Sequence, residues 1–381
     1  MQTEHTDALP RHVSWIENDT SQTALWLTEL AGKLPRRIVV VDDTLTADDA
    51  FQLANQGTHM LWRGDYHNAR QLLDALARRV DKKKRSKASL SPQQAFNHHR
   101  LAQSRRARLL GSLLLPLNGN GQIPLRRAPD VAAACKSVLG TLGEPALLPL
   151  RVLQGILGAA EWRRKGIVIP ALEQSLHVHW GVFSPIRGEY IDLVANAPLP
   201  ETDTAFDIGT GSGVLAAVLA RRGIRHVVAT DIDDRALACA QENIERLGLS
   251  AQVRLERTDL FPDGQAGLIV CNPPWLPARP TSAIESAIYD PDSSMLAGFL
   301  AGLADHLAPD GEGWLILSDL AELLGLRERS FLAKAIEAGG LKVLGRLDAR
   351  PKHPKAFDVT DPLHEARVAE VTTLWRLGRL K

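Results

Sequence analysis

Short apolar runs alternate with helical patterns along the second half of the chain. Aliphatic runs bounded by Gly, Pro or Asp predict strands, and apolar residues that return every three or four positions predict helices. The predicted strands cover residues 167–170, 176–183, 205–208, 227–230, 253–255, 267–271, 313–318, 341–347 and 370–377. The predicted helices cover residues 188–195, 214–222, 233–247, 299–307 and 331–338. This alternation predicts a doubly wound, mostly parallel α/β sheet with helices on both faces.

The first half of the chain has a weaker pattern. Strands are predicted at 37–41 and 59–63, and helices at 22–30, 68–80, 124–143 (one short helix within this range) and 147–164. Ser91-Pro92 predicts the start of a helix that runs through the leucines to Leu114 and is stopped by Pro116. Because 381 residues exceed the size at which one core keeps growing, two domains are expected. The break at Gly143-Glu144-Pro145 divides the chain into an N-terminal mixed α/β domain at 1–145 and a second domain at 146–381.

The net charge of +1 conceals an uneven distribution of charge. Eleven Lys or Arg and no Asp or Glu lie between Lys82 and Arg127. Such a segment is typical either of a solvated helix face or of a surface that binds phosphates or an acidic protein. Phe96 is the only aromatic residue within it, which weakens the case for stacking on single-stranded nucleic acid. The basic segment 82–127 is therefore a candidate contact for RNA or for a protein substrate.

Composition narrows the class of protein. A hydrophobic content of 45% and a charged content of 23% are ordinary for a soluble globular protein. Cys135, Cys239 and Cys271 are odd in number and far apart, which argues against a disulfide framework or a zinc site. The first residues lack the apolar core of a signal peptide, and no run reaches transmembrane length. We therefore expect a cytoplasmic protein that does not associate with membranes.

The most informative stretch is AFDIGTGSGVLAAVL, residues 205–219. A short apolar strand leads into glycines at every second position, Gly209, Gly211 and Gly213, and an apolar helix follows at once. A strand that enters a helix through glycines leaves backbone N–H groups free at the helix N-terminus, where they bind a polar or anionic ligand. Glycine is required because a side chain would keep the ligand away from the backbone. Several nucleotide-binding folds share such a turn, so the turn alone does not identify the ligand.

Two acidic residues and a second motif define the ligand more closely. Asp207 precedes the first glycine, and Asp231 follows the next apolar run, where an acid accepts hydrogen bonds from a ribose diol. The pattern D-x-G-x-G-x-G with Asp231 resembles the cofactor loop of class I S-adenosylmethionine-dependent methyltransferases. Downstream, Asn272-Pro273-Pro274-Trp275 resembles the NPP(Y/F/W) motif of those members that methylate a planar nitrogen. The resemblance covers roughly residues 167–380.

The resemblance implies a methyltransferase sheet with an antiparallel last strand, and S-adenosylmethionine as cofactor. Asp207 and the loop amides would hold the methionine end, Asp231 the ribose hydroxyls, and Asp259 the adenine amino group. The cofactor contacts expected in full are Asp207, Gly209, Thr210, Gly211, Gly213, Asp231, Ile232, Asp259, Leu260 and Asn272. They follow predicted strand ends, where open α/β sheets bind ligands. A helix cap or a turn is the alternative role of each aspartate.

The predicted catalytic residues are Asn272, Pro273, Pro274 and Trp275. An amide or aryl amine is a poor nucleophile because its lone pair is delocalised. The Asn272 side-chain carbonyl and the Pro273 backbone carbonyl could accept both N–H groups and so favour the developing cationic nitrogen. The prolines stiffen the turn, and Trp275 offers a flat face for a planar amide or base. The alternative is a Pro-Pro turn that ends a strand beside a buried Trp.

The residues after this motif bear on the methyl acceptor. The segments that resemble the release factor glutamine methyltransferases are Trp275-Leu276-Pro277, Glu285, Tyr289-Asp290-Pro291, Leu296-Ala297-Gly298 and Gly302-Leu303. The chain departs from that group at Trp275 for Tyr, Asp290 for Glu and Phe299 for the second Gly. The two-domain length and Gly181-Val182-Phe183-Ser184 instead resemble ribosomal-RNA guanine methyltransferases, which carry His at the position of Leu276.

We predict an N-methyltransferase that acts on a planar amino nitrogen, with an N-terminal domain that selects the substrate. A glutamine amide of a translation-associated protein ranks first, an rRNA or tRNA base amine (guanine or adenine) second and a small molecule third. A non-catalytic RNA-binding scaffold is the alternative from another class. His177 and His179 share a face of a predicted strand, but no third ligand is evident nearby, so no metal site is expected.

Overall fold

The computed structural model describes residues 11–27, 32–82, 90–279 and 288–380. The chain divides into two compact units. The N-terminal unit comprises residues 1–89 and 98–160, and the C-terminal unit comprises residues 90–97 and 161–381. By this division the expected boundary at 145 lies inside the N-terminal unit. None of the described helices is long and apolar enough to cross a membrane.

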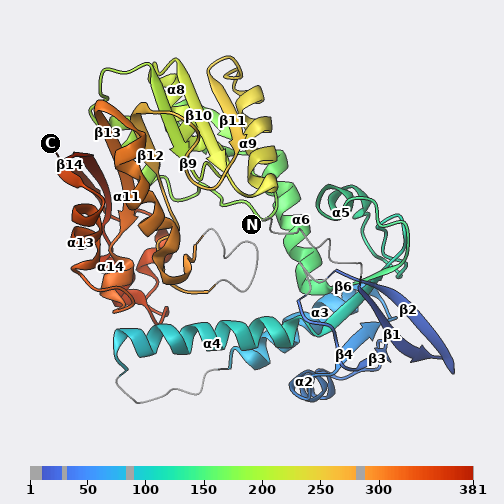
Figure 1. The fold of residues 1–381 in the computed structure, drawn as a ribbon. Coiled ribbons are helices and arrows are strands. Elements are labelled where there is room, and N and C mark those ends of the chain that lie inside the picture. Colours follow the sequence, from blue (N-terminus) through green and yellow to red (C-terminus); the bar gives the residue numbers. More distant parts are fainter. Residues whose placement is uncertain (1–10, 28–31, 83–89, 280–287, 381) are drawn as a thin grey trace. The chain divides into compact units, whose positions relative to one another are not determined.

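A seven-stranded sheet forms the centre of the C-terminal unit (Figure 1). Its order is β11-β10-β9-β12-β13-β15-β14, with parallel pairs as far as β13 and antiparallel pairs on both sides of β15. The strands are β9 (Thr204–Ile208), β10 (His226–Asp231), β11 (Val253–Arg257), β12 (Ala266–Cys271), β13 (Leu307–Ser318), β14 (Leu341–Ala349) and β15 (Thr372–Arg379). The chain changes direction across the sheet between β9 and β12, and such a switch point is where these sheets bind ligands. The predicted doubly wound sheet is confirmed.

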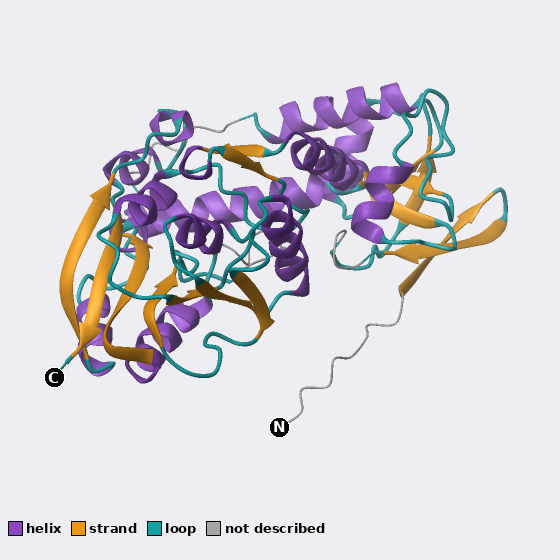
Figure 2. Ribbon diagram, turned by 90° about the horizontal axis from the view of Figure 1, so that it is seen from above, coloured by secondary structure: helices purple, strands orange, loops and turns teal. Residues whose placement is uncertain are grey.

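Helices cover both faces of the central sheet (Figure 2), and alternate side chains of its strands pack in opposite layers. Ala205 of β9 packs in the layer formed with α7, α8 and α9, whereas Phe206 packs in the layer formed with α11 and α13. In β13, Trp314 packs in the first of these layers and Leu315 packs in the second. The helices are α7 (Glu189–Asn196), α8 (Val214–Arg221), α9 (Asp234–Arg246), α11 (Ser294–His306) and α13 (Phe331–Ala338). Because both faces are covered, these strands are apolar at nearly every position.

Smaller elements complete the C-terminal unit. They are β7 (Ile167–Ile169), η1 (Pro170–Leu172), β8 (Gln174–Leu176), η2 (Pro291–Ser293), α12 (Leu320–Leu323), η3 (Pro354–Phe357) and α14 (His364–Ala369). The prediction of a strand over 176–183 is wrong beyond its first residue, because β8 ends at Leu176. The connection between β14 and β15 contains the short helix α14.

The N-terminal unit is built on a six-stranded mixed sheet of order β1-β2-β6-β5-β4-β3. The pairs β3–β4, β4–β5 and β2–β6 are parallel, and β1–β2 and β5–β6 are antiparallel. Its strands are β1 (Arg11–Glu17), β2 (Thr20–Trp26), β3 (Ile38–Val41), β4 (His59–Trp62), β5 (Leu113–Leu117) and β6 (Ala146–Pro149). The helices of this part of the chain are α2 (Ala47–Asn55), α3 (Tyr66–Val80), α4 (Pro92–Leu110), α5 (Ala132–Leu139) and α6 (Leu150–Lys165). The predicted mixed α/β character is confirmed.

The helix predicted over 22–30 is wrong. Residues 20–26 form β2, which pairs with β1 in an antiparallel hairpin, and residues 28–31 lie outside the described part of the chain. The hairpin turns at Asn18 and Asp19, whose φ angles are 50° and 59°. Positive φ at both central residues gives the turn whose twist matches that of the paired strands.

The prediction that one helix runs from Ser91 to Leu114 is also wrong at its end. Ser91 does begin the helix, since its hydroxyl accepts the Gln94 N–H at 3.2 Å. The helix ends at Leu110, and Leu113–Leu117 becomes the buried strand β5 between β4 and β6. A continuous run of leucines fits a buried strand as well as a helix, so the run alone did not distinguish them.

The layer beneath α11 allows a test of the packing. Phe299 is fully buried against the sheet, and Phe357 is 53% exposed. Phe299→Ala should lower the free energy of unfolding by about 3–5 kcal/mol, since it removes apolar contacts and leaves a cavity. Phe357→Ala, the matched control, should change the free energy of unfolding by less than about 0.5 kcal/mol. Urea titration followed by circular dichroism measures both; equal losses would contradict this packing.

Candidate active site

The carboxyl ends of four parallel strands bring the predicted site residues to one edge of the C-terminal sheet. The glycine loop follows β9, Asp231 ends β10, Asp259 follows β11 and Asn272 follows β12. In the register of the sheet, Ile208 pairs with both Thr230 and Cys271. The residues that follow these three strands therefore leave the sheet side by side, as the sequence predicted.

The glycine loop, residues 209–213, has a backbone that only glycine adopts readily. Gly209, Gly211 and Gly213 have φ angles of 70°, 57° and 81°. A Cβ on Gly213 would lie 3.2 Å from Cα of Ala240, so this glycine also lets α9 approach the loop. A Cβ on Gly211 would have no atom within 4 Å. The loop is thus closely packed at Gly213 and open at Gly211, where a ligand can approach the backbone.

Asp207 is held inside the protein and not at its surface. Asp207 is 1% exposed. Its Oδ2 accepts a hydrogen bond from the Thr210 hydroxyl at 2.6 Å and another from the Ala216 N–H at 3.0 Å. Burial raises the pKa of this carboxyl to about 6, although both hydrogen bonds lower it. Asp207 therefore fastens the glycine loop to the first turn of α8. A direct contact with the methionine end of a cofactor stays a prediction.

Asp231 and its neighbours lie at the more open side of the edge. Its two carboxylate oxygens accept the N–H groups of Gly211 and Asp233, each at 3.0 Å, and burial raises its pKa. A carboxylate offers about four lone-pair positions, so two remain for a ribose diol. Ile232 is 62% exposed and Asp259 is exposed. An exposed apolar side chain and an exposed acid at this edge are compatible with the predicted contacts to the face and the amino group of adenine, which stay predictions.

Leu260 supports this corner of the site through its backbone. Its φ is 65°, and its carbonyl oxygen accepts the Thr230 hydroxyl at 2.7 Å. The helix α11 passes close to it, because a Cβ on Gly298 would lie 2.8 Å from the Leu260 Cδ1. A Cβ on Gly302 would likewise lie 2.7 Å from the Phe261 Cε2. A side chain at either glycine would therefore displace a neighbour: the end of the Leu260 side chain at Gly298, or the Phe261 ring at Gly302.

The Asn272–Trp275 loop is fixed by contacts within it and beyond it. The Trp275 indole N–H donates to the Asn272 Oδ1 at 3.0 Å. Leu276 forms a bridge with Tyr289, and its carbonyl oxygen accepts the Asp290 N–H at 2.9 Å. Pro273 is buried, whereas Asn272 and Trp275 are half-buried. The polar and aromatic groups of this loop are thus partly accessible.

Asp290 is a structural residue of this loop. It is 4% exposed, and its carboxylate accepts the Ser294 hydroxyl at 2.8 Å and the N–H groups of Met295 and Leu296 at 3.0 and 3.2 Å. These groups belong to the first turn of α11, so Asp290 joins that turn to the Asn272–Trp275 loop. Glu285, the other acid of this series, lies outside the described residues.

Three further residues, which the sequence did not reveal, form a chain of contacts that begins at Trp275. The Arg187 guanidinium carbon lies 5.6 Å from the Trp275 ring centroid. Arg187 also donates to Oε2 of Glu370 at 3.2 Å, and the Ser318 hydroxyl donates to Oε1 of Glu370 at 2.7 Å. Glu370 is 1% exposed and Ser318 is fully buried. Only the fold unites these positions, since they are far apart in the sequence.

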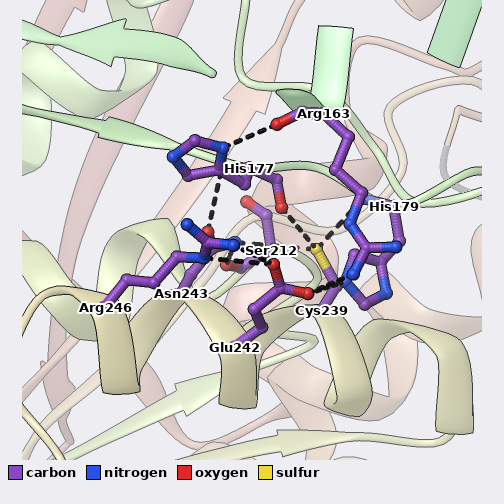
Figure 3. Close-up of polar contacts among 8 residues, drawn as sticks. All are labelled: Arg163, His177, His179, Ser212, Cys239, Glu242, Asn243 and Arg246. Carbon is purple, nitrogen blue, oxygen red and sulfur yellow. Dashed lines mark hydrogen bonds and ion pairs between the residues drawn. The ribbon is translucent and has the colours of Figure 1, made fainter. Parts of the chain in front are cut away.

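A second group of residues supports the glycine loop from α9 (Figure 3). Asn243 is fully buried; its Nδ2 donates to the Ser212 carbonyl at 3.0 Å, and its Oδ1 accepts the His177 N–H at 2.8 Å. Cys239 accepts the His179 N–H at 3.4 Å, and burial raises the pKa of its thiol to about 11. Side chains of α9 thus take the place of a neighbouring strand, which is why β8 stops at Leu176. The sequence signal for this group of contacts was Asn243, a polar residue on the apolar face of the helix predicted at 233–247.

The two histidines of this segment do not form a metal site. The His177 Nδ1 lies 2.6 Å from the Arg163 carbonyl oxygen, and the His179 Nε2 lies 2.7 Å from the Glu242 Oε2 (Figure 3). Arg163 and Arg246 also pair with Glu242. Burial opposes ionisation of Glu242, but its hydrogen bonds to His179 and Arg163 lower its pKa to about 2. Among the described residues no group of three or more His, Cys, Asp or Glu could hold a metal ion.

The raised pKa of Asp207 predicts a pH-dependent cost in stability. The folded protein holds this proton up to about pH 6, whereas the unfolded chain releases it near 3.8, so the contribution of Asp207 to stability falls as the pH rises between these values. Each pKa unit corresponds to about 1.4 kcal/mol, so the difference between the folded and unfolded pKa values corresponds to about 3 kcal/mol of stability. Asp207→Asn cannot ionise but keeps an oxygen as acceptor. Urea titrations should show the variant gaining about 2–3 kcal/mol relative to wild type between pH 4 and pH 7; a difference independent of pH would contradict this.

Comparisons with known proteins agree with this site. The family model described as ribosomal protein L11 methyltransferase (PrmA) matches residues 192–273, which include the glycine loop, Asp231 and Asn272. The chain is 32% identical over 184 residues to a release factor glutamine methyltransferase of Cereibacter sphaeroides, covering 44% of this chain and 63% of that protein. It is 30% identical over 204 residues to the release factor glutamine methyltransferase of Gloeobacter violaceus, covering 48% of this chain and 67% of that protein.

A relative with a different substrate matches to a similar degree. The chain is 31% identical over 163 residues to a tRNA1(Val) (adenine(37)-N6)-methyltransferase of Shewanella loihica, covering 39% of this chain and 66% of that protein. All three relatives are named as methyltransferases: two as release factor glutamine methyltransferases and one as a tRNA adenine methyltransferase. With its doubly wound sheet and the glycine loop at the switch point, the chain belongs to the class I S-adenosylmethionine-dependent methyltransferases, and S-adenosylmethionine is its cofactor.

Proposed function

We propose that this methyltransferase transfers the methyl group to a planar amino nitrogen, and that the acceptor is a glutamine side-chain amide of a translation-associated protein. One observation supports the proposal above the others. The Asn272–Trp275 loop leaves β12 beside the glycine loop that follows β9, so an acceptor nitrogen on one loop would face a cofactor on the other.

The described residues fit S-adenosylmethionine. Gly211 is open to a ligand, Asp231 has unoccupied lone pairs, and Ile232 is an exposed apolar residue at the same edge. The glycine loop would hold the methionine part, Asp231 the ribose, and Ile232, Asp259 and Leu260 the adenine. When bound, the cofactor supplies a methyl group on a positively charged sulfur, which is electrophilic without further activation.

The chain's own residues would act on the acceptor nitrogen. The Asn272 Oδ1 and the Pro273 carbonyl oxygen would accept its two N–H groups, and these dipoles favour the positive charge that develops as the nitrogen attacks. The ring of Trp275 would hold the planar amide in the orientation that attack requires. The surplus proton then leaves to water. No strong base is needed, since these acceptors act before the proton departs.

Two observations favour a glutamine amide over an RNA base. Two relatives that cover 44% and 48% of this chain are release factor glutamine methyltransferases. Three arginines of the basic segment 82–127 also pair with acids: Arg106 with Asp81 at 2.8 Å, and Arg126 and Arg127 with Asp65 at 2.8 and 2.6 Å. Paired arginines attract phosphates less than free ones. Residues 83–89, which hold further lysines, lie outside the described part.

An RNA base amine is the second candidate. It is favoured by the basic segment as a whole and by the matched tRNA adenine methyltransferase. In either case we assign the choice of substrate to the N-terminal unit, and its basic segment to the contact with a ribosomal protein, a release factor or RNA. Binding through the basic segment to RNA would weaken steeply with salt.

A transfer assay distinguishes the candidates. The purified protein, S-adenosylmethionine labelled in the methyl group, and lysate of cells that lack this protein are incubated together, and portions are treated with protease or nuclease. Label removed by protease alone is the expected result. Label removed by nuclease alone would move the acceptor to RNA, and label only in a small molecule would contradict both candidates. No label in any fraction would contradict the methyltransferase proposal itself.

Asn272→Ala provides the control for catalysis in the same assay. Loss of one preorganised acceptor should lower the transfer rate about 100-fold or more, while the affinity for S-adenosylhomocysteine, measured by calorimetry, stays near that of wild type. The matched control is Asn196→Ala at the exposed end of α7, which should leave both values unchanged. A wild-type rate in Asn272→Ala would contradict the role of Asn272.

A further inference from the structure

The contact between Trp275 and Asn272 has a consequence for the reaction. The indole N–H lies 3.0 Å from the Asn272 Oδ1. An indole N–H can only donate, and the two ends of an asparagine amide differ, one being an acceptor and the other a double donor. The contact is favourable when the Asn272 side-chain oxygen points toward the indole N–H. It is unfavourable when the Asn272 amino group points toward the indole N–H, because both groups are donors. Trp275 therefore selects one of the two orientations of the Asn272 amide.

We propose that Trp275 is a positioning residue, whose indole N–H holds the Asn272 amide with its oxygen available to the acceptor nitrogen. The inference rests on the proposed function, because it concerns the same nitrogen. A carbonyl oxygen has two lone pairs; the indole occupies one, and the other remains for an N–H of the acceptor. With the amide turned over, its amino group would face the acceptor and repel those N–H groups.

The ring of Trp275 is itself held from a second direction. The Arg187 guanidinium lies over the ring at 5.6 Å from the centroid, a geometry in which a cation is attracted to the ring face. Arg187 is oriented by Glu370 at 3.2 Å, and Glu370 by Ser318 at 2.7 Å. These partners come from the ends of β13 and β15 and from the turn before α7. The orientation of Asn272 is therefore fixed by the sheet and not only by its own loop.

Trp275→Phe tests the proposal because it keeps an aromatic ring and removes the N–H. With lysate of cells lacking the protein as acceptor and saturating labelled S-adenosylmethionine, the apparent kcat should fall about threefold to tenfold, the range expected for one neutral hydrogen bond. The apparent KM for the lysate acceptor and the affinity for S-adenosylhomocysteine should change less than about twofold. A loss of structure alone would instead lower the melting temperature and the affinity together.

Trp162→Phe is the matched control, since Trp162 is 56% exposed on α6 and far along the chain from the loop. It should keep wild-type values throughout. A Trp275→Phe rate equal to or above that of wild type would overturn the inference while leaving the proposed function intact. A higher rate would mean that the indole competes with the acceptor for Asn272. If the wild-type protein transfers no label, the proposed function and the inference both fail.

The hydrogen bond can also be observed without any acceptor. In protein labelled with ¹⁵N in tryptophan, the Trp275 indole signal is identified by its absence from Trp275→Phe. Its proton should exchange slowly with solvent in wild type, and Asn272→Ala should shift the signal and speed its exchange while the other indole signals stay in place. An unchanged Trp275 signal in Asn272→Ala would overturn the inference, whatever the transfer assay shows.

Discussion

The active edge depends on how the glycine loop is held after it leaves the sheet. Beyond Ile208 the pairing with β12 ends, one backbone bond to β10 remains (from the Thr210 N–H to the Thr230 carbonyl oxygen, 2.8 Å), and three residues of the loop have left-handed backbone angles. Hydrogen bonds from side chains hold the loop in place. Asp207 accepts from Thr210 and Ala216, Asp231 accepts from the Gly211 N–H, and Asn243 donates to the Ser212 carbonyl. Asp207 is buried and Asp231 is half-buried, and burial raises the pKa of both carboxyls, so a fixed loop is obtained at a cost in stability. Such local costs are typical of functional sites.

At this edge of the sheet, the contacts to the cofactor and to the acceptor are divided between two loops. The glycine loop and Asp231 would serve the cofactor, and the Asn272–Trp275 loop would serve the acceptor. Each loop is tied to the layer of helices that covers its side of the sheet. Asn243 of α9 holds the first loop, and Asp290 joins the second to α11. The distance between the loops is thus set by the rigid sheet, as proximity catalysis requires.

The sequence predicted the parts of this architecture that depend on local patterns. Alternation of apolar runs and helices was enough for the parallel sheet, and the glycines with Asp231 were enough for the cofactor edge. The hairpin at Asn18-Asp19 was missed because its turn residues were weighed less than the helical spacing after them. The strand expected over 176–183 failed because its backbone partners are side chains of α9.

Other features could not be predicted, since they depend on residues far apart in the sequence. Arg187, Ser318 and Glu370 carry no motif, and only the fold links them to one another and, through Arg187, to Trp275. Burial also gave Asp207 a role within the loop, where the sequence indicated a ligand contact. Sequence patterns thus located the site, and tertiary packing determined what each acid does in it.

Calorimetric titration with S-adenosylhomocysteine tests most directly that this edge binds the cofactor. The account predicts one site per chain and an affinity about 10- to 100-fold weaker in Asp231→Ala, since hydrogen bonds to a charged group are lost. Asp203→Ala, at the opposite end of β9, should bind as wild type. Absence of binding to the wild-type protein, or equal affinity in Asp231→Ala, would contradict the account.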